Sequence, residues 1–158
     1  YFNAAGAHKS GLIGESHDPE THLIPTILES INNSDTFKIF GNDYLTPDGT
    51  CIRDYIHVDD LAEAHILSLN YIKKNKGFSA FNLGNGLGFS VLDIIKACKQ
   101  VSNSDIKYKI DKKREGDPPK LVADIAKAEN ILKWKPRHSK IDTIISSAWK
   151  WHSSNRNY

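Results

Sequence analysis

The stretch Asp48–Leu61, DGTCIRDYIHVDDL, constrains the fold more than any other part of the chain. Its order is a turn, a short β-prone run, the pair Arg53-Asp54, a second β-prone run and a helix start at Asp59-Asp60. We expect this unit to hold Arg53 on a rigid platform, where the planar donors of its guanidinium match a phosphate or a carboxylate. From this stretch alone, a surface arginine paired with Asp54 or another acid is the favoured interpretation.

A second arginine shifts that balance, because it stands in another stiff turn, Arg114-Glu115-Gly116-Asp117-Pro118-Pro119. Two arginines that share one anion in a partly dry cleft bind it several times more strongly than an exposed ion pair would. Beside them we place Asp117 as the acceptor for paired ribose hydroxyls and Phe40 as an apolar face for a base. The set predicts a grip on a nucleotide diphosphate, with Arg53 and Arg114 on the phosphates.

Strand-like and helix-like patterns alternate along the 158 residues, which predicts one domain of the α/β class. Strands are expected at 1–6, 37–41, 50–52, 55–58, 78–83, 106–110 and 121–123. Helices are expected at about 22–31, 60–72, 90–98, 124–132 and 139–149. Three of these helices open with residues at capping-box spacing, namely Asp60 and Glu63, Ser90 and Asp93, and Ser139 and Asp142. The expected apolar face of the second helix consists of Ala62, Ile66, Leu69 and Ile72. The first, third and last helices have apolar stripes at helical spacing, which are Ile24, Ile27, Leu28 and Ile31; Val91, Ile94, Ile95 and Cys98; and Ile141, Ile144, Ile145, Ala148 and Trp149.

Charge and hydropathy argue against several classes of partner. The 21 basic residues are nearly matched by 19 acidic ones, and a net charge of +2 does not favour nucleic-acid binding. No apolar run approaches the ~20 residues that cross a bilayer and no signal-peptide pattern is present, which favours a cytoplasmic location without a membrane partner. Cys51 and Cys98 are isolated and are expected to be free thiols. A chain that starts inside a strand-like run and contains no methionine is expected to be a piece of something longer.

Three further patterns have simple explanations. The glycines of Gly84–Gly88 lie before an expected helix, but the third comes two residues after the second instead of three, so a plain turn is favoured about threefold over a dinucleotide site. His8, His17 and His22 have irregular spacing and no adjacent acid pair, which favours solvent-facing histidines over metal ligands. No nucleophile with a base and an orienting group can be assembled, so no catalytic residue and no metal site is assigned.

Seven blocks resemble, in the same order, the C-terminal half of the UDP-glucose 4-epimerase family, a group of extended short-chain dehydrogenases/reductases. The blocks are YFNAAGA at 1–7, ETHLIP at 20–25, IFGNDY at 39–44, DGTCIRDYIHV at 48–58, FNLG at 81–84, REGDP at 114–118 and WKP at 134–136. The block at 48–58 is specific within that superfamily, since related nucleotide-sugar enzymes usually have a shorter segment before their Arg-Asp pair. The resemblance implies a Rossmann-type α/β fold with the last strands of the parallel sheet but without the N-terminal NAD-binding half.

The resemblance also implies an activity, that of an NAD-dependent isomerase that interconverts UDP-glucose and UDP-galactose. In the family a tyrosine takes the proton of the sugar 4-hydroxyl, hydride passes to NAD, the 4-keto sugar turns over, and hydride returns to its other face. The glycine-rich NAD loop and the catalytic Tyr-x-x-x-Lys of the family precede the part matched here. We therefore expect residues 1–158 to be one UDP-sugar-binding portion of a homodimeric parent enzyme, inactive alone and unable to retain NAD.

Site residues follow from the resemblance by position. The substrate-binding set is Asn3, His22, Leu23, Lys38, Phe40, Arg53, Arg114, Asp117 and Leu121, and Tyr1 is a candidate cofactor contact. Asn3 and His22 would reach the phosphates or the sugar. Leu23, Lys38 and Phe40 would frame the uridine, partly through backbone groups. The two arginines would bind the pyrophosphate, and Asp117 the ribose.

Leu121 matches a family position where smaller residues are associated with N-acetylated sugars, so UDP-GlcNAc is an expected further substrate. Two other functions stay open on the sequence. One is a different UDP-sugar-modifying relative, such as a decarboxylase or a dehydratase. The other is a nucleotide-sugar-binding module without activity, against which the exposed strand at Tyr1 argues because it would present unpaired backbone groups at a sheet edge.

Overall fold

The computed structural model describes residues 1–154, which form an α/β arrangement as the alternating patterns predict. In chain order the elements are β1 (Asn3–Ala5), α1 (Leu23–Asn33), β2 (Phe37–Phe40), β3 (Ile52–Arg53), β4 (Tyr55–His57), α2 (Val58–Lys74), β5 (Phe89–Ser90), α3 (Val91–Ser102), β6 (Tyr108–Asp111), β7 (Lys120–Leu121), the π-helical segment η1 (Ala128–Leu132) and α4 (Ile141–Ser154). None of the helices among residues 1–154 combines the length and apolar content that a bilayer crossing requires.

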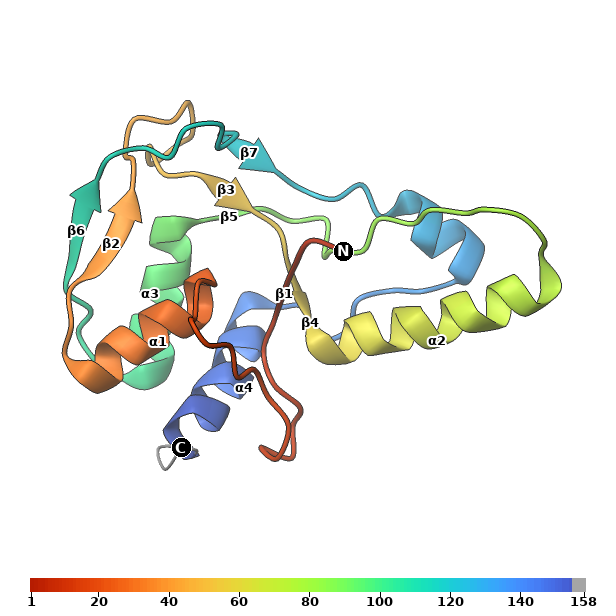
Figure 1. The fold of residues 1–158 in the computed structure, drawn as a ribbon, viewed down its shortest axis with the longest axis horizontal. Helices are drawn as coiled ribbons and strands as arrows, with labels where there is room; N and C mark the ends of the chain where they lie inside the picture. The colour runs from red at the N-terminus through yellow and green to blue at the C-terminus, as the bar shows by residue number, and fades with distance from the viewer. Residues whose placement is uncertain (155–158) are drawn as a thin grey trace.

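The strands form three small sheets. In the first two, β1 pairs in parallel with β4 and β2 pairs in parallel with β6. In the third, β3 lies between β5, which runs antiparallel to it, and β7, which runs parallel. The turn of Asp54 carries the chain from β3 into β4, so one short segment connects two sheets. Figure 1 shows α1, α3 and α4 gathered on one side of β1 and β4, while α2 extends away on the other side.

The main core lies among α1, α3 and α4, whose apolar stripes at helical spacing meet one another. Its fully buried members include Ile27, Leu28, Ile94, Ile144 and Ile145. The capping box expected at the start of α3 is present, because the Ser90 hydroxyl accepts from the backbone N–H of Asp93 and the Asp93 carboxylate accepts from that of Ser90. Cys98 is fully buried in this core, as a small apolar residue would be.

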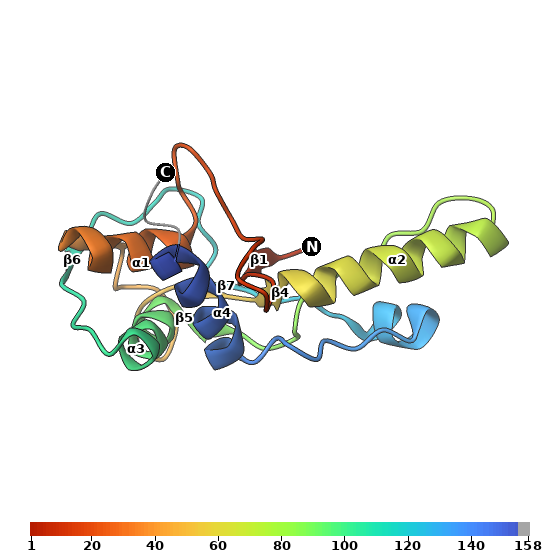
Figure 2. The same cartoon turned by 90° about the horizontal axis from the view of Figure 1, so that it is seen from below.

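A second core lies under α2, and it corrects the face expected for this helix. Ile66, Leu69 and Ile72 are more than half exposed, at 60%, 56% and 58%. Ala64 is buried instead, and it packs with Trp134 and other residues of the segment around η1. The helix has apolar residues on two faces, so periodicity alone selected the wrong one. Figure 2 shows η1 and the segment after it running along one side of α2.

The residue that caps α2 also differs from the expectation. His57 is the N-cap, and its Nδ1 accepts a hydrogen bond of 3.1 Å from the backbone N–H of Asp59. Asp60 is fully buried in the first turn and accepts from the backbone N–H groups of Arg137 and His138 and from the hydroxyl of Ser139. The expected capping boxes at Asp60 and Ser139 therefore do not form, because these two side chains bind each other.

One expected strand is absent, and one helix and one strand are shorter than expected. Residues 78–83 form no strand, and Phe78 is 93% exposed. At the end of this run, Leu83 is buried and its carbonyl oxygen accepts a hydrogen bond from the backbone N–H of Phe2. The helix expected over 124–132 covers only 126–132, and most of it is the π-helical η1. At the start of the chain, only 3–5 of the expected strand 1–6 is paired, and Tyr1 is 74% exposed.

Candidate anion-binding cavity

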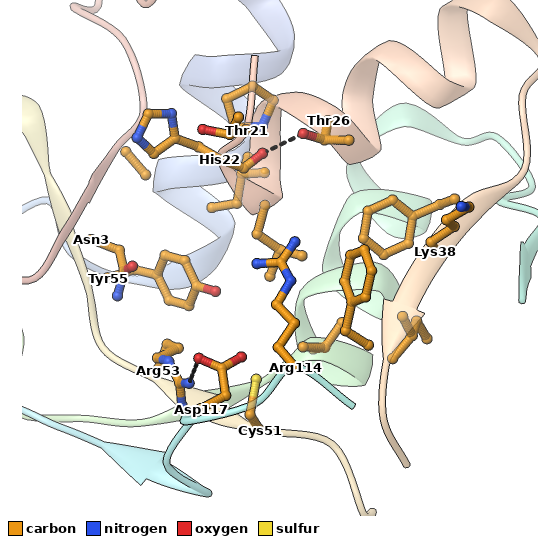
Figure 3. Close-up of a pocket in the computed structure, with 18 of the residues that line it drawn as sticks. Asn3, Thr21, His22, Thr26, Lys38, Cys51, Arg53, Tyr55, Arg114 and Asp117 are labelled. Carbon is orange, nitrogen blue, oxygen red and sulfur yellow. Dashed lines mark hydrogen bonds and ion pairs between the residues drawn. The ribbon is translucent and has the colours of Figure 1, made fainter. Parts of the chain in front are cut away.

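One cavity of about 250 Å³ brings together eight of the nine residues expected to bind substrate. The eight are Asn3, His22, Leu23, Lys38, Phe40, Arg53, Arg114 and Asp117. They come from β1, the start of α1, β2, β3 and the segment between β6 and β7, so the cavity forms only when the three sheets meet. Figure 3 shows Arg114 reaching into the cavity between Tyr55 on one side and Lys38 on the other.

Arg53 is the better fixed of the two arginines. Its Nη1 donates to the backbone oxygens of Ile52 and Pro118 at 2.9 and 2.8 Å, and its Nη2 donates to Oδ1 of Asp117 at 3.2 Å. Its side chain is only 15% exposed. The acid that pairs with Arg53 is therefore Asp117, and not the neighbouring Asp54. A guanidinium has five N–H donors, so these three bonds orient Arg53 and leave donors for an anion.

Arg114 is held differently, by an aromatic ring. Its guanidinium carbon lies 4.0 Å from the centre of the Phe40 ring, and Arg114 takes part in none of the ion pairs found among residues 1–154. The flat face of the guanidinium rests on the ring, while its N–H groups at the edge stay available to an anion. Lys38 adds a third positive charge, although its Nζ is 3.3 Å from the carboxylate of Asp111. The cavity is thus lined by three cations and one carboxylate.

The platform under Arg53 depends on Asp54, a residue whose role the sequence did not indicate. Asp54 is fully buried, and its carboxylate accepts from the backbone N–H groups of Asn85, Gly86 and Ala123 at 2.8, 3.0 and 3.1 Å. Its own backbone oxygen accepts from the amide of Asn3 at 2.6 Å. A buried carboxylate that gathers three donors fixes the loops on both sides of β3.

The same contacts explain the glycine-rich run at 84–88. The N–H groups of Asn85 and Gly86 point at Asp54, so they are not free to cradle a phosphate. A Cβ on Gly84 would lie 2.5 Å from the Asp54 carboxylate and 2.6 Å from Cβ of Ala123, which accounts for the glycine. In the described part of the chain no strand directly precedes the run, which is irregular up to β5, so the expected strand-to-helix turn is only partly found. The N–H groups of Asn85 and Gly86 serve the fold and not a bound phosphate.

The residues that line the cavity without having been expected there include Thr21, Cys51 and Tyr55. Burial raises the pKa of the Tyr55 hydroxyl and, to a lesser degree, of the Cys51 thiol, so both are neutral at physiological pH. Sequence reasoning missed them because a tyrosine and a cysteine in a strand usually belong to the core. Asn3 and Tyr55 are partners in the ladder of β1 and β4, and Arg53 precedes Tyr55 by two positions, so this register was the available signal.

Two predicted contacts lie elsewhere. Leu121 is on β7, opposite Arg53 in the ladder, but it is 47% exposed and outside the lining of the cavity. Tyr1 lines a second cavity of about 550 Å³, which shares Asn3 and His22 with the first. One literal Tyr-x-x-x-Lys spacing does occur in the chain, from Tyr108 to Lys112. It runs along β6, where four residues span about 13 Å, so the two side chains are not held together as they would be on a helix.

Fold and cavity together define an α/β protein with a cationic pocket of the size and charge that suit a nucleotide phosphate. The chain belongs to the NAD dependent epimerase/dehydratase family, whose model matches residues 1–84. Along its whole length it is homologous to UDP-glucose 4-epimerases. The enzyme of that name from Lactobacillus helveticus is 52% identical over 155 residues, which are 98% of this chain and 47% of the relative.

Solved structures give the same relationship. The UDP-glucose 4-epimerase from Bifidobacterium longum in complex with NAD+ and UDP superposes with a TM-score of 0.93 at 40% identity, over 99% of this chain and 47% of that one. The UDP-Glc/GlcNAc 4-epimerase from Campylobacter jejuni superposes with a TM-score of 0.77 at 40% identity, over 98% and 47%. The chain therefore spans about half the length of the curated relatives it matches.

Proposed function

We propose that this chain is the UDP-sugar-binding portion of a UDP-glucose 4-epimerase, corresponding to the C-terminal half of that enzyme. One observation carries the proposal: Arg53 and Arg114, which are 61 positions apart in the chain, line the same cavity. A diphosphate carries its charge on several oxygens. It suits two planar guanidinium groups, because each can donate two parallel hydrogen bonds.

The residues of the cavity would then divide the ligand among them. Arg53, fixed by Asp117, would hold one phosphate, and Arg114 would close on the other while staying on Phe40. Asp117 uses only Oδ1 for Arg53, so its second oxygen would accept from a ribose hydroxyl. Leu23, Phe40 and the stem of Lys38 would frame the base. A tight grip on UDP leaves the hexose outside this set, where it would be free to present either face to the chemistry of the complete enzyme.

Features outside the cavity support the view that the chain is one part of a larger α/β unit. Ile66, Leu69 and Ile72 follow one another at intervals of three positions along α2, and all three are exposed. They form a continuous apolar face, unlike the single apolar residues that are scattered over an ordinary surface. The strand β1 is hydrogen-bonded to β4 on one edge only among the described residues. A further strand and its helix would cover both features. We infer that hydride transfer depends on such a further part, so the purified chain would neither retain NAD nor convert UDP-galactose.

Titration of the isolated chain with UDP tests the proposal. We expect saturable shifts in the amide NMR signals of Arg53, Arg114 and Asp117, and much weaker binding of uridine, which has no phosphates. Arg53→Lys should weaken UDP binding about 10-fold or more, because a charge-assisted bidentate contact contributes about 1.5–3 kcal/mol. Arg137→Ala is the matched control, since Arg137 is 72% exposed and lies outside the cavity. Equal binding of UDP and uridine, or an unchanged Arg53→Lys variant, would contradict the proposal.

A further inference from the structure

We propose that Glu15, His17, Glu20 and His22 form a binding site for one divalent transition-metal ion of the zinc type, in the loop that leads into α1. Each of the four residues contributes one ligand atom, and all four atoms lie within 4.8 Å of one another. In the sequence, the spacing of His8, His17 and His22 is irregular, and no pair of adjacent acids lies beside them. The fold brings the two acids and the two histidines together, and the site is separate from the proposed UDP contacts except at His22.

The distances show a compact group in which one ring nitrogen lies within hydrogen-bond distance of two carboxylate oxygens. Nδ1 of His22 lies 2.9 Å from Oε1 of Glu15 and 2.8 Å from Oε1 of Glu20. Oε1 of Glu15 also lies 2.8 Å from Nδ1 of His17. A ring nitrogen carries at most one hydrogen, so the single N–H of His22 faces two carboxylate oxygens at once. A cation among the four atoms would satisfy the Glu15 oxygen, whereas Oε1 of Glu20 already accepts from two backbone N–H groups.

Charge favours the same conclusion. Two of the four ligands are carboxylates, and the Glu20 side chain is only 6% exposed. A divalent ion would neutralise the pair. Imidazole nitrogen with carboxylate oxygen is a donor set that suits Zn²⁺.

The geometry requires only small movements. Bonds of about 2.0–2.2 Å around tetrahedral zinc place ligand atoms about 3.3–3.6 Å from one another. The ligand atoms here lie from 2.8 Å to at most 4.8 Å from one another, so the observed distances include that range. His17 and His22 are 61% and 50% exposed, and an ion can therefore reach them from solvent.

The two glutamates are already held in place by other contacts. The indole N–H of Trp151 donates to the backbone oxygen of Glu15 at 2.7 Å, which anchors that residue to α4. Oε1 of Glu20 accepts from the backbone N–H groups of Thr21 and His22, both at 2.7 Å. Supporting bonds of this kind orient ligands and reduce the ordering that binding requires. A metal ion here would link the loop 15–22 to the start of α1.

Zinc chloride added to the EDTA-treated chain tests the proposal without any nucleotide. The imidazole NMR signals of His17 and His22 should move to bound positions and saturate at one equivalent of zinc. The signals of His8 and His65, which lie outside the cluster, should stay in place. Absence of a shift at tenfold excess of zinc, or equal movement of all four histidines, would overturn the assignment.

Variants supply a second, independent measurement. His17→Gln and Glu15→Gln should each weaken zinc binding at least ~10-fold in competition with a chromogenic chelator, because a ligand is lost. His8→Gln is the matched control and should bind as the wild type does. With Co²⁺ in place of zinc, the near-ultraviolet spectrum should lack thiolate-to-metal charge-transfer bands, which separates this site from Cys51. Unchanged affinity in both ligand variants would also overturn the assignment, and the wild-type NMR titration decides the matter if either variant fails to fold.

Discussion

The guanidinium of Arg114 lies over the ring of Phe40, with its central carbon 4.0 Å from the ring centre. Arg114 belongs to the exposed turn after β6, whereas Phe40 ends β2, and β2 and β6 are paired along their length. The ring therefore holds the Arg114 guanidinium in the cavity without using any of its N–H donors. This relationship leads to the first prediction.

Replacing Phe40 with leucine should weaken UDP binding about 2- to 5-fold. The leucine keeps an apolar surface but has no ring face for Arg114, and an exposed cation–π contact contributes about 0.5–1 kcal/mol. Calorimetric titration with UDP measures the change. Phe78→Leu is the control because Phe78 is 93% exposed and distant from the cavity lining. An affinity equal to that of the wild type would show that Arg114 does not depend on the ring.

Asp54→Asn should lower the free energy of unfolding by about 2–4 kcal/mol. Oδ1 and Oδ2 both accept backbone N–H groups in a fully buried position, so an amide NH2 placed at either site would face a donor and leave it unpaired. Urea denaturation gives the difference directly. Asp43→Asn, at an acid that is 72% exposed, should leave the midpoint of unfolding unchanged. A stable Asp54→Asn variant would refute the assigned role of this carboxylate.

Tyr44→Phe should leave the free energy of unfolding unchanged or raise it by about 1 kcal/mol. The Tyr44 hydroxyl is the one buried side-chain polar atom without a hydrogen-bond partner in the described part of the chain, and its removal ends the cost of burying it. The ring contact with Lys113, at 4.0 Å, is kept by phenylalanine. If thermal and urea unfolding both show a loss above about 1 kcal/mol, the hydroxyl has a partner in solution.

Stability should fall as the pH drops below about 6.5, with His57 as one source. Burial lowers the pKa of His57 in the folded state below its ordinary value of 6.5, so the unfolded chain takes up its proton first. The contribution of His57 is therefore fully present above pH 6.5 and is lost as the pH falls from there through the folded pKa. His57→Asn, which can still cap α2, should flatten the slope of stability against pH. His65→Asn, at an exposed histidine, should not. The same slope in His57→Asn and wild type would assign the effect to other groups.

Leu121→Tyr, in a full-length enzyme that contains this chain, should lower kcat/KM for UDP-GlcNAc more than for UDP-galactose. The proposal comes from the family position of Leu121, which lies opposite Arg53 in the ladder of β3 and β7. A bulky ring would take space from the N-acetyl group while leaving a hydroxyl in the same place unaffected. Equal failure of wild type and variant on UDP-GlcNAc would count against it.

Local sequence rules succeeded where one helix face or one turn decides the structure. The stripes of α1, α3 and α4 and the capping box at Ser90 follow from spacing alone, because each depends on residues three or four positions apart. They failed for α2, which has two apolar faces, and for Asp60, which was expected to cap a helix. Which face is buried, and which donor a carboxylate meets, depends on segments far away in the chain, here the segment around Trp134 and the loop at 137–139.

The fold class, the apolar stripes of three helices and the residue types of an anion site can be predicted from the sequence, since these are properties of short windows. The pairing of Arg53 with Asp117 and the contact of Arg114 with Phe40 in the same cavity become known only from the packed fold. The same holds for the convergence of two glutamates and two histidines of one irregular loop. These contacts have one physical reason: side chains meet at angles and distances that the packing of whole elements sets, and no local pattern encodes that packing.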